Sequence, residues 1–245
     1  MGILKGLTQL GGRASLTALS RHIDENPAKV HRYLASLVAE GLLLQDSVSA
    51  QYLLGPESIR IGLAAMRLAD PTRVAEPELV KLRERLEMTC FVAVMGNKGP
   101  TIVRFEEPGL PVTLNVRVGT VLSLLWSATG RICLAFLDDS HIRALAAEEL
   151  AAAPAKRRAL LNGRDPVGVI QADVRRHGLA IVKDTNLQGI SAIAAPIFDF
   201  SNRVQAVLTV LGPTGSFDLA ADAVVARTLA KAARDISDAL GHSGR

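Results

Sequence analysis

The residue types that most often perform catalysis or bind metals are scattered along this chain. None of its five histidines has a cysteine, an aspartate or a second histidine at metal-ligand spacing. Cys90 and Cys133 fall in apolar stretches, where cysteine usually serves as a small buried hydrophobe. No nucleophile-elbow, zinc-protease, Walker or dinucleotide-binding motif is present. We therefore expect neither an enzyme nor a metal or other cofactor.

The most informative pattern is a predicted helix over residues 26–40. Asn26 followed by Pro27 is typical of a helix start. At about 100° per residue, the apolar stripe formed by Val30, Leu34 and its neighbours lies opposite Arg32. Small side chains flank Arg32, so the helix backbone can approach another surface closely, and arginine is the commonest reader of guanine edges. The pattern predicts a helix that enters the major groove of DNA.

The neighbouring segments support this interpretation. Helical spacing predicts helices over residues 3–10 and 15–23, and two short apolar runs at 42–44 and 51–54 predict a hairpin with a polar tip. This order of elements is that of a winged helix-turn-helix domain, which we assign to residues 1–56.

We expect the DNA contacts to come from the predicted recognition helix and, more weakly, from the hairpin tip, which has no basic residue. His31 is either a structural residue or a phosphate contact. The candidate DNA-binding residues are Asn26, Ala28, Lys29, His31, Arg32, Ser36, Gln45 and Ser47.

A linker follows, and then the pattern changes. Residues 57–70 form an amphipathic pattern that Pro71 should close, and the interval from Pro71 to Pro77 suits a connector before a helix over 77–88. Beyond residue 90, short apolar runs alternate with helical patterns, which predicts an α+β domain. The predicted strands are 91–95, 101–105, 112–118, 179–182, 192–198 and 204–211, and the predicted helices are 127–137, 140–162, 166–177 and 218–240.

One part of this large domain favours ligand binding. Ser127 is placed to cap the helix that follows it, which would leave the amides of residues 128–130 free to face a cavity. Free amides at a helix start suit an anionic group. A polar loop over residues 184–191 leads into an apolar strand across the expected sheet. Apolar walls with a few aimed polar groups are what a small-molecule sensor needs.

Composition narrows the class of protein. Only 4% of the residues are aromatic, which argues against an RNA-binding protein that stacks bases on exposed rings. The net charge of +4 is compatible with a polyanionic partner but does not require one. No apolar run is long enough for a membrane span or a signal peptide, so we expect a cytoplasmic protein without membrane contact.

Four segments carry a resemblance to a known family. They are NPAKVHRYLASL at 26–37, EGLL at 40–43 with YLLGP at 52–56, VGTVLSLLWSATGR at 118–131, and Gly189 followed by AIAAPIFD at 192–199. Together they resemble the IclR family of bacterial transcriptional regulators over nearly the whole chain. The resemblance implies a dimer or tetramer, dimerisation through a helical linker (residues 57–76) and a GAF-like antiparallel-sheet domain (77–245) that binds a small effector, often an aromatic or short-chain carboxylate.

The family's pocket can be carried over position by position. The implied ligand-binding residues are Leu125, Ser127, Ala128, Asp184, Gly189, Ser191 and Ala192. Three positions depart from the family pattern: the usual pair of acids separated by one residue appears as Val182-Lys183-Asp184, which leaves a single carboxylate, Ala192 replaces a cysteine, and Leu125 replaces a histidine. These changes make the expected pocket less polar than is usual. The first helix also starts almost at Met1, so we expect either a trimmed helix or a start codon that lies further upstream.

We therefore expect a regulator that binds a near-palindromic DNA operator as a dimer or tetramer and senses a small metabolite. One alternative is a thiol-dependent enzyme or redox protein that uses Cys90 or Cys133, with the N-terminal helices serving only assembly. A further alternative is a protein-binding adaptor without DNA contact.

Overall fold

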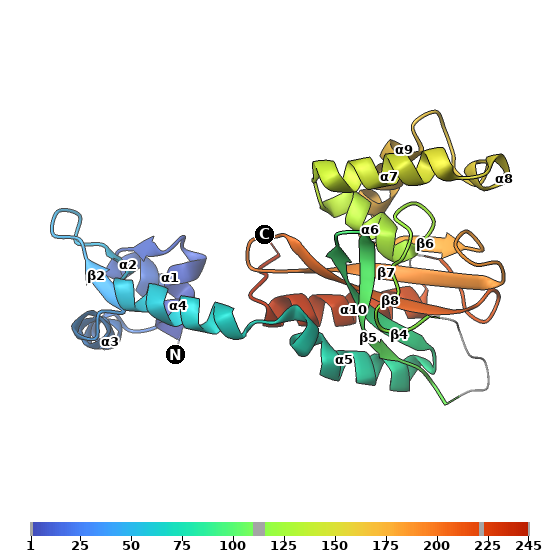
Figure 1. Ribbon diagram of the computed structural model, residues 1–245. Coiled ribbons are helices and arrows are strands. Elements are labelled where there is room, and N and C mark those ends of the chain that lie inside the picture. Colours follow the sequence, from blue (N-terminus) through green and yellow to red (C-terminus); the bar gives the residue numbers. More distant parts are fainter. Residues whose placement is uncertain (1, 110–115, 221–222, 245) are drawn as a thin grey trace. The chain divides into compact units, whose positions relative to one another are not determined.

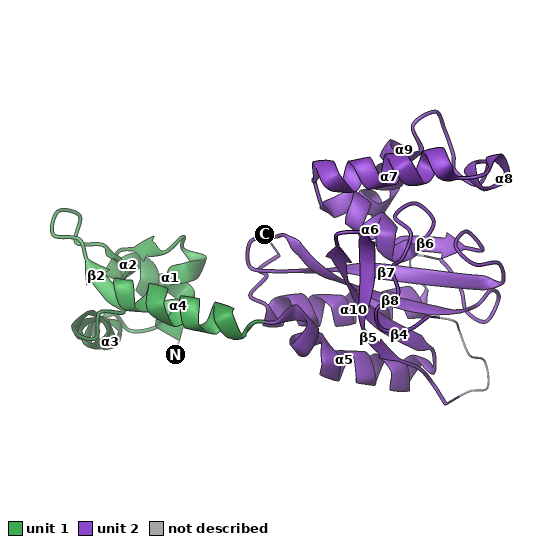
Figure 2. Cartoon of the chain, in the orientation of Figure 1, with its two compact units in different colours: residues 1–69 green, residues 70–245 purple. Residues whose placement is uncertain are grey.

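The chain folds into two compact units that divide between Ala69 and Asp70 (Figure 2). The computed structural model describes residues 2–109, 116–220 and 223–244. Within these ranges no helix has both the length and the apolar character needed to cross a membrane.

The first unit is the winged helix-turn-helix that the sequence predicts (Figure 1). Its elements are α1 (Gly2–Gln9), β1 (Arg13–Ala14), α2 (Leu16–His22), α3 (Pro27–Ala39), β2 (Leu43–Gln45), β3 (Tyr52–Leu54) and α4 (Pro56–Leu68). The strands pair antiparallel in the order β1, β3, β2. Ser15 caps α2, and its hydroxyl accepts a hydrogen bond from the amide of Ala18 at 3.2 Å. The strand β1 was not predicted, because its two residues are too few to show a pattern.

The core of the first unit joins the helices to the sheet. Its buried side chains are Leu7, Ala14, Leu19, Val30, Leu34, Leu43 and Tyr52. Val30 and Leu34 come from the predicted inner stripe of α3, so that face of the helix is confirmed. By contrast, α4 buries none of its side chains.

The second unit is a five-stranded antiparallel sheet with helices on both faces (Figure 1). Its elements are α5 (Pro71–Leu86), β4 (Thr89–Gly96), β5 (Gly99–Glu106), α6 (Ala128–Phe136), α7 (Ser140–Ala152), α8 (Ala155–Arg158), α9 (Pro166–His177), β6 (Ala180–Lys183), β7 (Ile190–Phe198), β8 (Val204–Pro213) and α10 (Val224–Ala239). The strand order is β5, β4, β8, β7, β6. The predicted α+β class with an antiparallel sheet is confirmed.

Both faces of this sheet are covered. Helices α5 and α10 lie on one face, and α6 lies on the other with α7 and α9 beyond it (Figure 1). Side chains alternate along a strand, so Phe91 and Ala93 of β4 join the core around α6, while the buried Cys90 and Val92 point to the opposite face. Burial on both faces explains why the strands appear in the sequence as nearly unbroken apolar runs.

Two predicted helix starts were wrong. The expected connector from Pro71 to Pro77 is instead the first part of α5, which Asp70 caps by accepting from the amide of Thr72 at 2.9 Å. Pro71 occupies the first turn, where its missing N–H needs no partner, so it starts a helix rather than ending one. In addition, α10 begins at Val224 rather than near Asp218.

The predicted strand over residues 112–118 is not fully covered, since 112–115 lie outside the described residues. The remaining part was wrongly predicted: residues 116–118 are not in a strand. They lead into a tight turn in which the amide of Thr120 donates to the carbonyl of Arg117 at 2.9 Å. The chain then runs along β5, where the amide of Leu122 donates to the carbonyl of Pro100 at 2.7 Å.

Candidate functional site

The start of α3 is built as the sequence predicts. Asn26 is the N-cap, and its side-chain oxygen accepts a hydrogen bond from the amide of Ala28 at 2.8 Å. Pro27 follows in the first turn, where its fixed φ favours the helix. This cap uses the Asn26 oxygen and fixes the direction in which the chain enters the helix.

The outward face of α3 is open. Ala28, His31, Arg32 and Ser36 are all exposed. Ser36 donates its hydroxyl proton to the carbonyl of Arg32 at 3.3 Å, so this short side chain stays close to the helix backbone. The Arg32 side chain makes no hydrogen bond or ion pair with any other described residue. An unpaired guanidinium among small residues is free to bind an external acceptor.

Lys29 is exposed but paired. Its ammonium lies 2.8 Å from the carboxylate of Glu25, one helical turn earlier. The hydrogen bond and charge of Glu25 raise the pKa of Lys29, and the same contact lowers the pKa of Glu25. Both groups are in water, so the ion pair is weak and a phosphate can replace the carboxylate.

The hairpin between β2 and β3 ends in an exposed tip that is organised by Asp46. Its carboxylate accepts from the amides of Val48 at 2.9 Å and Ser49 at 2.8 Å, and these hydrogen bonds lower the pKa of Asp46. Gln45 donates to the carbonyl of Ala50 at 3.3 Å, and Ser47 is exposed. The tip therefore offers a serine hydroxyl and the apolar Val48, and no cation.

A second candidate site lies at the start of α6. Ser127 caps this helix as predicted, and its hydroxyl oxygen accepts from the amide of Gly130 at 2.9 Å. The same hydroxyl donates its proton to the carbonyl of Ser123 at 2.6 Å. A Cβ at Gly130 would lie 2.0 Å from that carbonyl oxygen, so glycine lets residues 123–124 pack directly on the helix.

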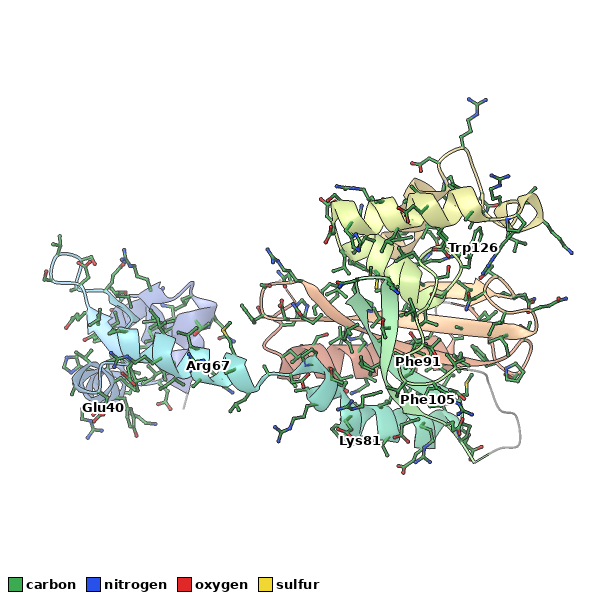
Figure 3. All side chains as sticks on the ribbon, in the orientation of Figure 1. Glu40, Arg67, Lys81, Phe91, Phe105 and Trp126 are labelled. Atoms are coloured by element: carbon green, nitrogen blue, oxygen red, sulfur yellow. The ribbon has the colours of Figure 1, made fainter. Side chains whose placement is uncertain are left out.

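A cavity of about 220 Å³ opens beside this helix start. Its lining is mostly apolar and contains no acidic or basic side chain. The lining residues are Phe91, Val116, Thr120, Val121, Leu122, Ser123, Ser127, Ala128, Thr129, Val182, Asn186, Leu187, Ile190, Ala192, Thr209 and Leu211. Phe91, on β4, is labelled in Figure 3 together with Trp126, which comes just before α6.

Three of the seven candidate ligand-binding residues line the cavity: Ser127, Ala128 and Ala192. Leu125 is fully buried within the core around α6 and is not part of the lining.

The other candidates hold the loop before β7. The carboxylate of Asp184 accepts from the amide of Gly189 at 2.8 Å and from the hydroxyl of Thr214 at 2.7 Å. Since the Thr214 proton goes to Asp184, the hydroxyl of Ser191 must donate to Thr214, 2.9 Å away. This network closes the loop that carries the lining residues Asn186 and Leu187.

The sequence reasoning missed a buried pair of threonines. The hydroxyls of Thr129 on α6 and Thr209 on β8 lie 2.9 Å apart, both side chains are 1% exposed, and both line the cavity. Only one of their two protons can lie between them. Among the described residues neither hydroxyl has a further partner, so one buried donor is left for a ligand. The signal in the sequence was Thr209, a polar residue within the apolar run 206–211 of β8.

A larger cavity, of about 490 Å³, lies in the first unit between α1 and α3. Its charged lining residues are Glu25 and Lys29, which pair with each other. It therefore has no charged group left for a ligand.

The two cysteines do not form a reactive site. Both are buried, and burial raises the pKa of each thiol to about 12. Each thiol is therefore protonated near neutral pH, whereas the thiolate is the nucleophile. This contradicts the alternative of a thiol-dependent enzyme. Within the described ranges, no group of three or more His, Cys, Asp or Glu side chains is placed to hold a metal ion.

Comparison with known proteins identifies the family of both units. Residues 64–238 match the family model described as "Bacterial transcriptional regulator IclR C-terminal", and residues 1–47 match the "IclR helix-turn-helix domain". The HTH-type transcriptional regulator BhcR of Paracoccus denitrificans (strain Pd 1222) is 27% identical over 225 residues, which cover 91% of this chain and 79% of that protein.

Solved structures of IclR-type regulators have the same fold as this chain. HmgR of Pseudomonas aeruginosa matches with a TM-score of 0.90 and 38% identity, covering 99% of this chain and 96% of its own. An IclR homologue from Microbacterium hydrocarbonoxydans, crystallised with 4-hydroxybenzoate, has the same fold, with a TM-score of 0.59 and 20% identity over 98% of this chain and 97% of its own. The chain belongs to the IclR family of bacterial transcriptional regulators and is a DNA-binding regulator rather than an enzyme.

Proposed function

We propose that this regulator binds a near-palindromic operator in the cytoplasm as a dimer or a pair of dimers. A small carboxylate, aromatic or short-chain, binds beside α6 and changes the affinity for DNA. The observation that carries the proposal is the apolar cavity, whose lining includes a buried hydroxyl donor left unpaired.

The DNA-reading element in this proposal is the outward face of α3. Arg32 would contact a guanine edge in the major groove, while the small side chains of Ala28 and Ser36 let the helix approach. Lys29 would exchange Glu25 for a backbone phosphate. Two copies of α3 would read half-sites one helical turn apart, as dimeric helix-turn-helix proteins do.

The proposed dimer contact is α4. None of its side chains is buried within the unit, although Ile59, Leu63 and Met66 follow one another at helical spacing. A monomer would leave this apolar stripe in water, and pairing with a second α4 would cover it.

Sedimentation velocity of the Leu63→Asp variant at micromolar concentration measures its oligomeric state and tests the proposed contact through α4. A charge in the paired stripe should produce monomers, while the control Val48→Asp, at another exposed apolar residue, should sediment like the wild type. Dimers in both variants would contradict the role of α4.

The effector-binding donors are neutral. The hydroxyl protons of Ser123 and Ser127 are donated to Glu149 and to the carbonyl of Ser123. The free donors are one proton of the buried pair, Thr129 with Thr209, and the amide of Ala128 in the first turn of α6, which has no acceptor within the described residues. Neutral donors at the positive end of a helix bind an anion without a cationic side chain.

The rest of the cavity sets the size and character of the ligand. About 220 Å³ is less than the roughly 300–1,000 Å³ of drug-sized pockets, so the ligand is small. Phe91, Leu122, Leu187 and Leu211 supply apolar walls that suit a ring. The Microbacterium homologue that binds 4-hydroxybenzoate supports an aromatic acid.

A thermal-shift screen of the full chain tests the proposal. Benzoate, 4-hydroxybenzoate and pyruvate are each compared with the matching neutral amide, because a ligand that binds the folded state raises the melting temperature. We expect at least one acid to raise it and its amide to have no effect. Equal shifts with acid and amide, or no shift with any acid, would contradict the proposed site.

A further inference from the structure

The wall of the effector cavity is held by a carboxylate from a different helix. The hydroxyl of Ser123 donates to Oε1 of Glu149 on α7, and the amides of Leu124 and Leu125 donate to Oε2 at 2.9 and 3.3 Å. The two oxygens of Glu149 thus collect three donors from consecutive residues, and no cation pairs with this carboxylate among the described residues.

These contacts continue to the cavity. Ser123, bound to Glu149, also accepts from the amide of Trp126 at 2.9 Å, and its carbonyl accepts the proton of the helix cap Ser127 at 2.6 Å. Ser123 and Ser127 line the effector cavity, whereas Glu149 does not. Glu149 therefore acts on the cavity through the residues that it holds.

The chain that leads into the wall lies between two hollows. Val121, Leu122 and Ser123 line both the effector cavity and a second hollow of about 440 Å³, which is also lined by Glu149. Residues 121–123 therefore have a hollow on each side, whereas Leu124, Leu125 and Trp126 are buried in the core around α6. The side chain of Arg131 donates a hydrogen bond to the carbonyl of Leu125 at 3.0 Å, and the hydroxyl of Thr185 donates one to the carbonyl of Trp126 at 2.6 Å.

In the described residues, Glu149 is the acceptor for the amides of Leu124 and Leu125. Helix α7 itself is anchored by the buried Ile142 and Ala146. Removing the Glu149 carboxylate should therefore leave α7 in place and let water from the second hollow reach the freed amides.

We propose that Glu149 is a positioning residue for effector binding: it fixes residues 123–126 as a rigid cavity wall and thereby sets the affinity for the acid. This inference rests on the proposed function, since it assumes that the cavity is the effector site. It extends that site to α7, outside the lining.

The first test needs no ligand. Hydrogen exchange of the full chain, followed by mass spectrometry, is compared for wild type, Glu149→Ala and Glu148→Ala. The second variant removes an exposed carboxylate from the neighbouring position of the same helix. We expect the peptide that contains residues 124–126 to exchange about tenfold faster in Glu149→Ala only. Unchanged exchange in that variant would overturn the proposal.

The second test measures binding of 4-hydroxybenzoate through the fluorescence of Trp126, the single tryptophan of the chain. Glu149→Ala should raise the Kd about tenfold, as expected if a tenth of the molecules keep a competent wall. Glu149→Gln keeps an acceptor for the amides of Leu124 and Leu125 and should stay within about threefold of wild type, as should Glu148→Ala. Wild-type affinity in Glu149→Ala would overturn the positioning role.

Two further outcomes are also decisive. If Glu149→Ala does not fold, Ser123→Ala removes one of the three donors to Glu149 together with the acceptor of the Trp126 amide. It should show faster exchange of residues 124–126 and weaker binding, by a smaller factor than Glu149→Ala; normal behaviour in that variant would overturn the proposal. If wild type binds neither 4-hydroxybenzoate nor any acid of the screen, the effector site fails, and the exchange experiment still decides whether Glu149 holds the wall.

Discussion

Replacing Arg32 by alanine tests the assignment of α3 as the DNA-reading helix. The Arg32 side chain is exposed and bonds to no other described residue, so its removal breaks no contact within the protein. Alanine and arginine both favour helices, and surface substitutions of this kind change stability by less than about 0.5 kcal/mol. Any larger effect on DNA binding must therefore come from a contact with DNA.

The expected size follows from one bidentate contact to guanine. Such a contact contributes about 1–3 kcal/mol, which corresponds to about a 5- to 150-fold change in affinity. A dimer that binds two half-sites loses this contact twice, so the full loss is about 2–6 kcal/mol if the half-sites act independently. Arg32→Lys keeps the charge but not the planar fork of donors, and it should lose most of the same energy.

The assay is fluorescence anisotropy on a duplex that the wild-type protein has selected from a random pool. Arg176→Ala serves as a charge control, because it removes one exposed cation from the second unit and should bind almost as wild type does. Wild-type affinity and specificity in Arg32→Ala would refute the role assigned to this residue. Full activity in Arg32→Lys would show that Arg32 contributes charge rather than base recognition.

Three further predictions concern the second unit. Ser127→Leu fills part of the effector cavity and removes the α6 cap, so it should abolish the thermal shift with acid while the anisotropy assay still shows DNA binding; a normal acid response would contradict the site. The double variant Thr129→Val and Thr209→Val keeps the shape of the cavity but removes its buried donor, and calorimetry should show acid affinity lowered at least about tenfold; unchanged affinity would exclude the pair as a ligand contact. Burial raises the thiol pKa of Cys90 and Cys133 from 9.0 to about 12, so the unfolded chain loses these protons at a lower pH than the folded chain. Urea unfolding should therefore show the free energy of unfolding falling between pH 9 and 12. At pH 8 the thiols of the folded protein should not react with Ellman's reagent. Rapid native labelling at pH 8 would contradict the burial of the thiols.

The features that sequence reasoning predicted well depend on nearby residues. The caps Asn26 and Ser127 bond an amide two or three positions along the chain, so their roles follow from local sequence. The inner stripe of α3 and the hairpin of β4 with β5 follow from helical and strand periodicity in the same way.

The features that were missed depend on contacts between distant segments. Thr129 meets Thr209 only because α6 packs on β8, and spacing along the chain gives no sign of that contact. Glu149 accepts three hydrogen bonds from a segment about 25 residues earlier, and the residues around it in the sequence give no sign of that contact. Asp184 was expected to contact the effector, while its carboxylate accepts donors from its own loop and from Thr214.

The most direct test of ligand-controlled DNA binding is a linkage measurement on the full chain. The Kd for the selected duplex is measured with and without the acid found by thermal shift, and the Kd for that acid is measured with and without the duplex. Because coupling between two sites is reciprocal, both Kd values should change by the same factor. A saturating acid that leaves the Kd for DNA unchanged would contradict the account.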